Sequence, residues 1–421
     1  MGVKPGYKQT DVGVIPEEWE AAPCSELCDR IMVGIVIRPA QYYVRDGVPA
    51  FRSANIREDG ITDLDLVFIS EKSNELLGKS KTRTGDVLTV RTGYPGTSAV
   101  VRAHHAGSNC IDILITRPSP AKLDSDYLAI WVNSPFGKEQ VLRNQGGLAQ
   151  KHFNVGDMRN LIVARPKLPE QRAIADVLRD LDALLGALNR LMAKKRDVKQ
   201  AAMQQLLAGH TRLPGFTGEW KVRRLGSVAE VIKGSALSKS LVETSGTRPC
   251  ILYGELFTIY GRVIRKILKR TNSHEGITSR SGDVLMPGST TTSGIDLATA
   301  SALLVDNVSI GGDVIIIRRK SEEYDPTFLA YYLTHARKRE IAELTQGITI
   351  HHLYGRDLKA LSIELPNTDE QEAIAAVLTE MDAELAVLAT KLAKTRELKQ
   401  GIIYELLTGR TRLVSPEMAD A

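Results

Sequence analysis

Hydrophobic residues recur along two long stretches of the chain with the spacing of a coiled coil. In the first stretch, Pro169 to Leu207, they lie alternately three and four residues apart, and a second stretch repeats them at equivalent places, 200 residues later (178 to 378). This spacing predicts two helices, each with one apolar seam that packs against a partner. The seam positions are Leu178, Leu181, Leu185, Leu188 and Met192 in the first helix and Leu378, Met381, Leu385, Leu388 and Leu392 in the second.

The ends of both stretches carry helix boundary signals. Pro169 suits a first helical turn, the first stretch contains no further proline, and Gly186 is its single glycine. Gly209 and Gly409 follow the stretches where a C′ residue is expected. A helix of 39 residues (169 to 207) would be about 58 Å long at 1.5 Å per residue.

Charged residues divide each predicted helix into an acidic beginning and a basic end. Asp180 and Asp182 lie early in the first helix, and Lys194, Lys195, Arg196 and Lys199 lie late, with the same order in the second helix. This polarity complements the helix dipole, and it also lets two such helices pair antiparallel. Solvated charges that stabilise the helix explain most of the pattern, and a direct nucleic-acid role for the late basic cluster stays open.

The chain consists of two tandem copies of a repeat of about 200 residues. "EQRAIADVL" at 170–178 matches "EQEAIAAVL" at 370–378, and "KHFNVGDMRNL" at 151–161 matches "HHLYGRDLKAL" at 351–361. Further upstream, "GDVL" at 85–88 corresponds to "GDVL" at 282–285, and Trp19 to Trp220. Two copies are too few for a solenoid, so the repeat predicts a molecule with pseudo-twofold symmetry.

The first 150 or so residues of each copy carry short β-branched runs separated by glycine, proline and asparagine. Examples are "DVLTVRT" in copy one and "GGDVIIIRR" in copy two. This punctuation predicts a β-rich domain, and one amphipathic stretch near the end of each copy adds a helix. The expected fold class is α+β: two tandem half-repeats, each a β-rich domain followed by a long helix, with the two helices paired as an antiparallel coiled coil.

Composition and charge narrow the function only a little. The net charge of +5 is compatible with nucleic-acid binding, but many enzymes are as basic. The four cysteines include one C-x₃-C (Cys24 and Cys28) and no second pair at zinc-ligand spacing, so we expect no metal site and a reducing compartment. No apolar run is long enough to cross a membrane, and the N-terminus lacks the core of a signal peptide. We therefore expect a cytoplasmic protein.

Motifs that would indicate catalysis are incomplete or absent. "NSPF" at 133–136 is close to the tetrapeptide with which amino-methyltransferases hold a flipped base, but no glycine-rich cofactor loop precedes it. It is better explained as a helix end stopped by Pro135. "GSTTTSG" at 288–294 lacks the lysine of a phosphate loop. The sequence thus favours a binding protein with no catalytic residues.

Basic, aromatic and amide side chains cluster in both β-rich domains. Arginine and lysine neutralise phosphates, while asparagine, tyrosine and further arginines can read base edges. A solvated basic surface is the competing explanation for any one of these residues. The candidate DNA-binding residues are Arg52, Asn55, Lys81, Arg83, Arg91, Tyr94, Lys151, His152, Tyr253, Tyr260, Arg262, Lys266, Thr291, His351 and His352.

Several of these segments resemble the specificity (S) subunit of type I restriction–modification systems, and the resemblance covers nearly the whole chain. Its strongest marks are "LPEQRAIADVL" from Leu168 and "LPNTDEQEAIAAVL" from Leu365, together with "LKQGIIYELLTGRTRL" at 398–413. "GDVLTVRTGYPGTSAVV" (85–101) and "ILYGELFTIYGRVI" (251–264) look like parts of target-recognition domains. The resemblance divides the chain into target-recognition domain 1 (1–168), a spacer helix (169–209), target-recognition domain 2 (210–366), a second spacer helix (367–409) and a tail (410–421).

The resemblance implies that the chain binds double-stranded DNA without catalysing a reaction. Each recognition domain would read one half of a split, asymmetric target, and two methyltransferase subunits would dock on the chain, where a restriction subunit can join them. No cofactor would be bound by this chain, because S-adenosylmethionine belongs to the methyltransferase subunits. Two alternatives stay open: a free-standing DNA adenine methyltransferase, and a coiled-coil scaffold that does not bind DNA.

Overall fold

The structure, a computed structural model, describes residues 4–143, 152–243 and 245–414. These residues divide into two units, and neither is one continuous half of the sequence. Unit 1 contains residues 1–189 and 391–421, and unit 2 contains residues 190–390. The long helices α6 (Leu168–Leu206) and α12 (Thr368–Leu407) each contribute one part to each unit.

Unit 1 is built on two small sheets. Its strands are β1 (Tyr7–Thr10), β2 (Gly13–Pro16), β3 (Glu20–Pro23), β4 (Cys28–Val33), β5 (Tyr43–Val44), β6 (Val48–Phe51), β7 (Ile56–Arg57), β8 (Gly60–Ile61), β9 (Val67–Ile69), β10 (Val87–Val90), β11 (Ser98–Val100), β12 (Asn109–Cys110), β13 (Ile113–Pro118) and β14 (Ile162–Arg165). Its helices before α6 are α1 (Cys24–Leu27), α2 (Glu71–Leu76), α3 (Ser125–Asn133), α4 (Pro135–Arg143) and α5 (Val155–Asn160).

Unit 2 is built in the same way. Its strands are β15 (Lys221–Arg224), β16 (Ala229–Lys233), β17 (Val242–Glu243), β18 (Arg248–Ile251), β19 (Val263–Ile264), β20 (Lys269–Thr271), β21 (Ile277–Thr278), β22 (Asp283–Pro287), β23 (Ser289–Thr290), β24 (Ser301–Leu303), β25 (Ser309–Ile310), β26 (Val314–Arg319), β27 (His351–His352) and β28 (Ser362–Leu365). Its helices before α12 are α7 (Leu225–Val228), α8 (Glu255–Thr258), α9 (Pro326–His335), α10 (Lys338–Glu343) and α11 (Gly355–Ala360).

The strand orders repeat between the units. The sheet β11-β10-β13-β4 of unit 1 corresponds to β24-β22-β26-β16 of unit 2, and all of these neighbours pair antiparallel. The second sheet, β12-β6-β9-β5, corresponds to β25-β18-β20-β17, and each contains one parallel pair at the same place. The α+β fold with two matching halves is thus confirmed.

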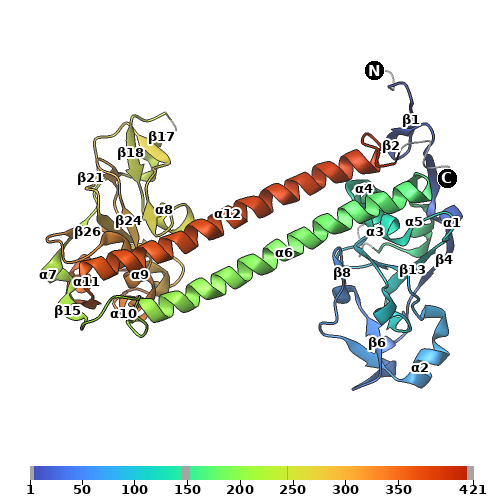
Figure 1. Cartoon of the computed structure of the whole chain (residues 1–421), viewed down its shortest axis with the longest axis horizontal. Coiled ribbons are helices and arrows are strands. Elements are labelled where there is room, and N and C mark those ends of the chain that lie inside the picture. The colour runs from blue at the N-terminus through green and yellow to red at the C-terminus, as the bar shows by residue number, and fades with distance from the viewer. Residues whose placement is uncertain (1–3, 144–151, 244, 415–421) are drawn as a thin grey trace. The chain divides into compact units, whose positions relative to one another are not determined.

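The two long helices pair antiparallel within each unit. In unit 1, the end of α12 lies alongside the start of α6 (Figure 1), and Lys399 forms an ion pair with Asp182. In unit 2, Lys199 and Lys195 of α6 pair with Asp382 and Glu384 of α12. These pairs confirm the predicted pairing of acidic with basic ends. All ten seam residues are buried or half-buried.

The end of each long helix packs into the core of the unit that contains the start of the other long helix. Leu406 and Leu407 of the last turn of α12 are buried in the main core of unit 1. Leu206 and Leu207 are buried in the main core of unit 2. Both helices are followed by a glycine with positive φ, +66° at Gly209 and +64° at Gly409, as predicted for C′ residues.

The repeated "EQ" pair fixes the beginning of each long helix. Glu370 is fully buried and forms a bidentate ion pair with Arg212. The equivalent ion pair in unit 1 joins Arg412 to Glu170. Gln371 donates to Pro366 O (2.8 Å) and accepts from Asp325 N (3.0 Å), which ties the helix to the cap of α9. The motif therefore has a structural role.

We expect the change Glu370→Ala to destabilise unit 2 by about 3 kcal/mol, because it leaves the Arg212 cation without its buried partner. Chemical denaturation monitored by fluorescence measures the loss. The matched control is Glu322→Ala, which breaks a surface pair with Arg319 in the same unit. This change should cost no more than about 0.5 kcal/mol. Equal losses for both variants would contradict a structural role for the buried pair.

Candidate nucleic-acid interface

Unit 2 contains a groove of about 760 Å³ that the strand β23 and the residues around β27 help to form. The strand β23 follows β22 directly, and it pairs with β27 so that Ser289 lies opposite His352 and Thr290 opposite His351. The backbone of Leu353 adds a hydrogen bond to Gly288 O (2.9 Å). The groove is lined by Tyr253, Gly254, Leu256, Phe257, Thr258, Arg262, Ser289, Thr290, Thr291, Thr292, Asp296, Thr299, Asp313, Ile350 and His352.

The groove brings together four of the predicted DNA-binding residues from three separate segments. Tyr253 and Arg262 come from the α8 region, Thr291 from the end of β23, and His352 from β27. Together they offer an aromatic face, a cation, a hydroxyl and an imidazole. These groups can contact both phosphates and base edges.

Arg262 is the one arginine or lysine among the described residues that line this groove. Its Nη1 donates to Thr334 Oγ1 (2.8 Å) on α9, which holds the side chain in place. Burial lowers the pKa of the Arg262 guanidinium, and the nearby Tyr331 and Asp382 oppose that shift. The group remains charged near neutral pH, and within the described residues only one of its five N–H donors has a hydrogen bond. A partly desolvated cation with unused donors is suited to bind a phosphate or a guanine edge.

Two carboxylates line the same groove. Asp296 accepts hydrogen bonds from Thr292 Oγ1 (2.6 Å) and Ser293 N (3.2 Å), and Asp313 accepts one from Ser289 Oγ (3.2 Å). A groove with both signs of charge is unlike a simple phosphate cradle. Carboxylates can accept from the amino group of cytosine, so the lining is compatible with base reading.

The other candidates of unit 2 lie outside the groove lining. Tyr260 accepts a hydrogen bond from Leu268 N (3.0 Å), and burial raises the pKa of its hydroxyl. Lys266 is exposed in the loop between β19 and β20, and His351 is half-buried in β27. These three residues stay predictions.

Unit 1 repeats one backbone hydrogen bond of the groove with different side chains beside it. Phe153 N donates to Arg91 O (3.0 Å), in the place of the bond between Leu353 and Gly288 in unit 2. His152 is exposed there, and Tyr94 is 85% exposed on the loop after β10. Arg91 forms an ion pair with Asp112, and its Nε donates to Phe153 O (3.3 Å). The two units share this backbone hydrogen bond, whereas the side chains beside it differ.

The remaining candidates of unit 1 have varied environments. Asn55 is fully buried and donates to Thr62 O (3.2 Å) and Leu64 O (2.8 Å), which holds this turn, and its role in DNA binding stays a prediction. Arg52 donates to Asp65 O (2.6 Å). Lys81 and Arg83 are exposed. Lys151 lies outside the described residues.

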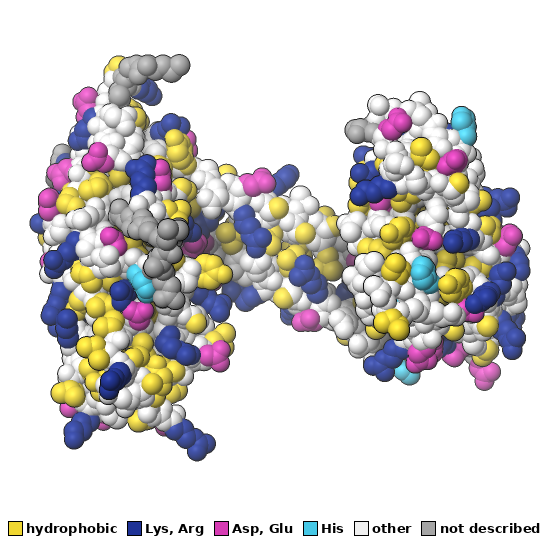
Figure 2. Space-filling view, turned by 180° about the vertical axis from the view of Figure 1, so that it is seen from behind, with side chains coloured by type: hydrophobic (Ala, Val, Ile, Leu, Met, Phe, Trp, Pro, Cys, Tyr) yellow, Lys and Arg dark blue, Asp and Glu magenta, His cyan; other side chains and the backbone are white. Residues whose placement is uncertain are grey.

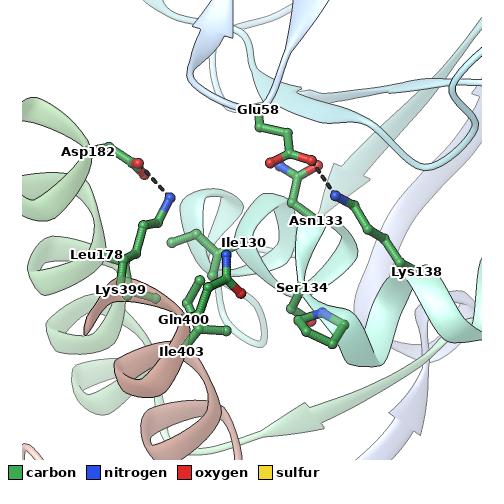
Figure 3. A pocket seen from close by; sticks show the side chains of 11 residues that line it. Glu58, Ile130, Asn133, Ser134, Lys138, Leu178, Asp182, Lys399, Gln400 and Ile403 are labelled. Atoms are coloured by element: carbon green, nitrogen blue, oxygen red, sulfur yellow. Dashed lines mark hydrogen bonds and ion pairs between the residues drawn. The ribbon is translucent and has the colours of Figure 1, made fainter. Parts of the chain in front are cut away.

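The "NSPF" motif lies at the boundary between two helices. The helix α3 ends at Asn133, as predicted, but Pro135 also begins α4. The Asn133 amide bonds with the backbone of Ser98, accepting from N (2.9 Å) and donating to O (2.8 Å). Figure 3 shows that Asn133 and Ser134 line a small cavity of about 140 Å³, whose two lysines are paired with carboxylates: Lys399 with Asp182 and Lys138 with Glu58. The motif thus has a structural role here.

The late basic cluster of α6 is divided. Lys195 and Lys199 form ion pairs with α12, while Lys194 and Arg196 are exposed. On the face shown in Figure 2, basic side chains are interspersed with acidic and hydrophobic ones on each unit. Charge distribution alone therefore does not mark a binding face, and the groove geometry is the stronger indicator.

Sequence reasoning missed several groove residues. Phe257, Asp296, Asp313 and Ile350 line the groove, yet they are spread over positions 257 to 350 and no motif connects them. Among the described residues, no group of three or more histidine, cysteine, aspartate or glutamate side chains could hold a metal ion. No helix in the described part of the chain is long and apolar enough to cross a membrane.

The fold defines a class of protein with two matched β-rich units that share two long antiparallel helices. Residues 217–397 match the family model of the type I restriction modification DNA specificity domain. The second half of the chain is thus similar to the DNA specificity domain of type I restriction modification systems.

Similar proteins cover nearly the whole chain. The provisionally named type I restriction enzyme MjaX specificity subunit of Methanocaldococcus jannaschii is 23% identical over 97% of both chains. The S subunit of a type I restriction–modification system from M. genitalium has a solved structure that covers 96% of this chain and 98% of its own, with a TM-score of 0.57 and 13% identity. A chain from a solved type I R-M system covers 94% of this chain and 99% of its own, with a TM-score of 0.57 and 21% identity. The structural likeness supports the fold.

Proposed function

We propose that this chain is the sequence-specific DNA-binding subunit of a type I restriction–modification complex and reads a bipartite, asymmetric target. The observation that carries the proposal is a backbone hydrogen bond that both units form, from Phe153 N to Arg91 O in unit 1 and from Leu353 N to Gly288 O in unit 2. The loop that follows this bond presents Tyr94 in unit 1 and Thr291 in unit 2. Two such loops with different side chains suit two different half-sites.

The long helices would set the distance between the half-sites. A helix of the 39 residues of α6 spans about 58 Å at 1.5 Å per residue, which corresponds to between one and two turns of a DNA duplex of about 34 Å. Ion pairs join α6 to α12 within each unit.

Partner subunits would carry out the chemical steps. Double-stranded DNA is the ligand of this chain. Two methyltransferase subunits, which carry S-adenosylmethionine, would transfer the methyl group, and a restriction subunit could join the assembly. The chain itself would bind no cofactor and catalyse no step. The relatives named as type I restriction enzyme specificity subunits support this division of labour.

Genome-wide mapping of methylated adenines tests the proposal. Cells that express this chain with its methyltransferase subunits should acquire one split, asymmetric methylated sequence, absent when this chain is omitted. Methylation by the purified chain alone would instead identify a free-standing methyltransferase. Unchanged methylation after omission of the chain would favour a scaffold that does not bind DNA.

A further inference from the structure

The loop between α10 and β27 in unit 2 is tightly held by its own backbone. Gln346 N donates to His352 O (2.9 Å), and His352 N donates back to Gln346 O (2.7 Å), which closes the loop at its base. Inside the loop, Gly347 has a φ of +116°, and a Cβ there would lie 1.9 Å from Ile350 O. Only glycine fits this turn, because any side chain would clash with the backbone of Ile350.

This loop presents an isoleucine to solvent. Ile348 is 96% exposed, the most exposed large hydrophobic side chain among the described residues. A single exposed apolar residue is ordinary on a protein surface. Ile348, however, lies two residues from Ile350, which is 46% exposed and lines the groove with the exposed rings of Tyr253 and Phe257.

The apolar group lies beside polar and cationic ones. Arg262, His352 and the threonines of residues 290–292 line the same groove. An apolar tip flanked by groups suited to phosphates and base edges is the arrangement with which proteins wedge open a base step. The sequence repeat keeps the same pair of residue types: Gly147 and Leu148, outside the described residues, precede Gly347 and Ile348 by 200 positions (148 to 348).

We propose that Ile348 inserts between two adjacent base pairs of the half-site bound by unit 2. This inference rests on the proposed function, since it requires that the groove bind duplex DNA. Burial of the isoleucine side chain between bases offsets part of the cost of unstacking them. The two hydrogen bonds at the base of the loop reduce the ordering cost on binding. The half-site of unit 2 should then contain an easily opened step, such as a pyrimidine–purine step, at a fixed position.

The test measures how an interruption of the base stack changes the affinity of the complex for its DNA target. Duplexes that carry the mapped target receive a single abasic site at each position of the half-site in turn, and the full chain assembled with its methyltransferase subunits is titrated against them. At one position, the wild-type complex should bind the abasic duplex about tenfold more tightly, because the unstacking cost is already removed. Ile348→Ala should show no such gain, while Ile348→Leu should retain it.

The matched control is Val222→Ala, which shortens another exposed aliphatic side chain in unit 2, on β15 and outside the groove lining. This variant should keep the tenfold gain. The insertion of Ile348 is contradicted if the wild-type complex binds its intact target but gains affinity at no abasic position. It is also contradicted if Ile348→Ala gains as much affinity as the wild type. Both outcomes leave the proposed function standing. A wild-type complex that binds no specific duplex contradicts the proposed function itself.

Discussion

A chain that ends at Thr390 will leave unit 1 unfolded while unit 2 stays folded. The truncation keeps every residue of unit 2, but it removes residues 391–421, which belong to unit 1. Ile403, Leu406 and Leu407 lie in that segment, and all three are buried in the main core of unit 1. The equivalent residues of unit 2, at the end of α6, lie in the middle of the chain and are retained.

The size of the effect follows from the buried groups that are lost. Removal of a buried leucine or isoleucine side chain costs about 2–5 kcal/mol, so three of them cost on the order of 10 kcal/mol. The cut also removes Arg412, which pairs with the buried Glu170, and Lys399, which pairs with Asp182. The total is comparable to the whole stability of a typical domain, about 5–15 kcal/mol.

Limited proteolysis and thermal unfolding measure this result. The truncated chain should show one protected fragment, from unit 2, and one unfolding transition. A peptide of residues 391–414 added in trans should restore protection of unit 1. The matched control is a chain that ends at Val414, which loses only residues outside the described range and should behave as the full chain does. Protection of unit 1 in the chain that ends at Thr390, without the peptide, would contradict the conclusion that unit 1 needs the end of α12 to fold.

The sequence predicts the helical part of this fold well because its signals are local. The seam positions, Gly209 and Gly409 are read from spacing along one helix, and the antiparallel pairing follows from charges on that same helix. Strand order and the bonds between Arg212 and Glu370 connect residues far apart in the sequence. No periodicity encodes such contacts, so they had to come from the structure.

The candidate interface is predicted only in part, because residue type does not reveal burial. Tyr253, Arg262, Thr291 and His352 line one groove. Asn55 has the same chemistry as a base-reading residue, but it is fully buried and satisfies carbonyl groups of its own turn. Ile348 was missed for the opposite reason: an isolated isoleucine in a loop forms no pattern, and only its exposure makes it notable.

Replacement of Arg262 by alanine should relax recognition of one half-site and leave the other unchanged. An arginine that contacts a base edge contributes about 1–3 kcal/mol of discrimination, so the preference for the correct half-site over single-base variants should fall about 10-fold to 100-fold. The fold should tolerate the change. Thr334 Oγ1 keeps its bonds to Ala330 O (2.8 Å) and Ala300 N (3.0 Å) after the guanidinium is removed.

Methylation rates of the assembled complex on duplexes with one altered base per half measure this discrimination. Lys221→Ala is the matched control, because Lys221 is an exposed cation of unit 2 on β15, outside the groove lining, and its loss should not change the discrimination. Tyr94→Ala, in unit 1, should relax the other half-site. If Arg262→Ala lowered discrimination equally at both halves, the two units would not act as independent recognition modules. If it changed neither half, the groove would not be the surface that reads DNA.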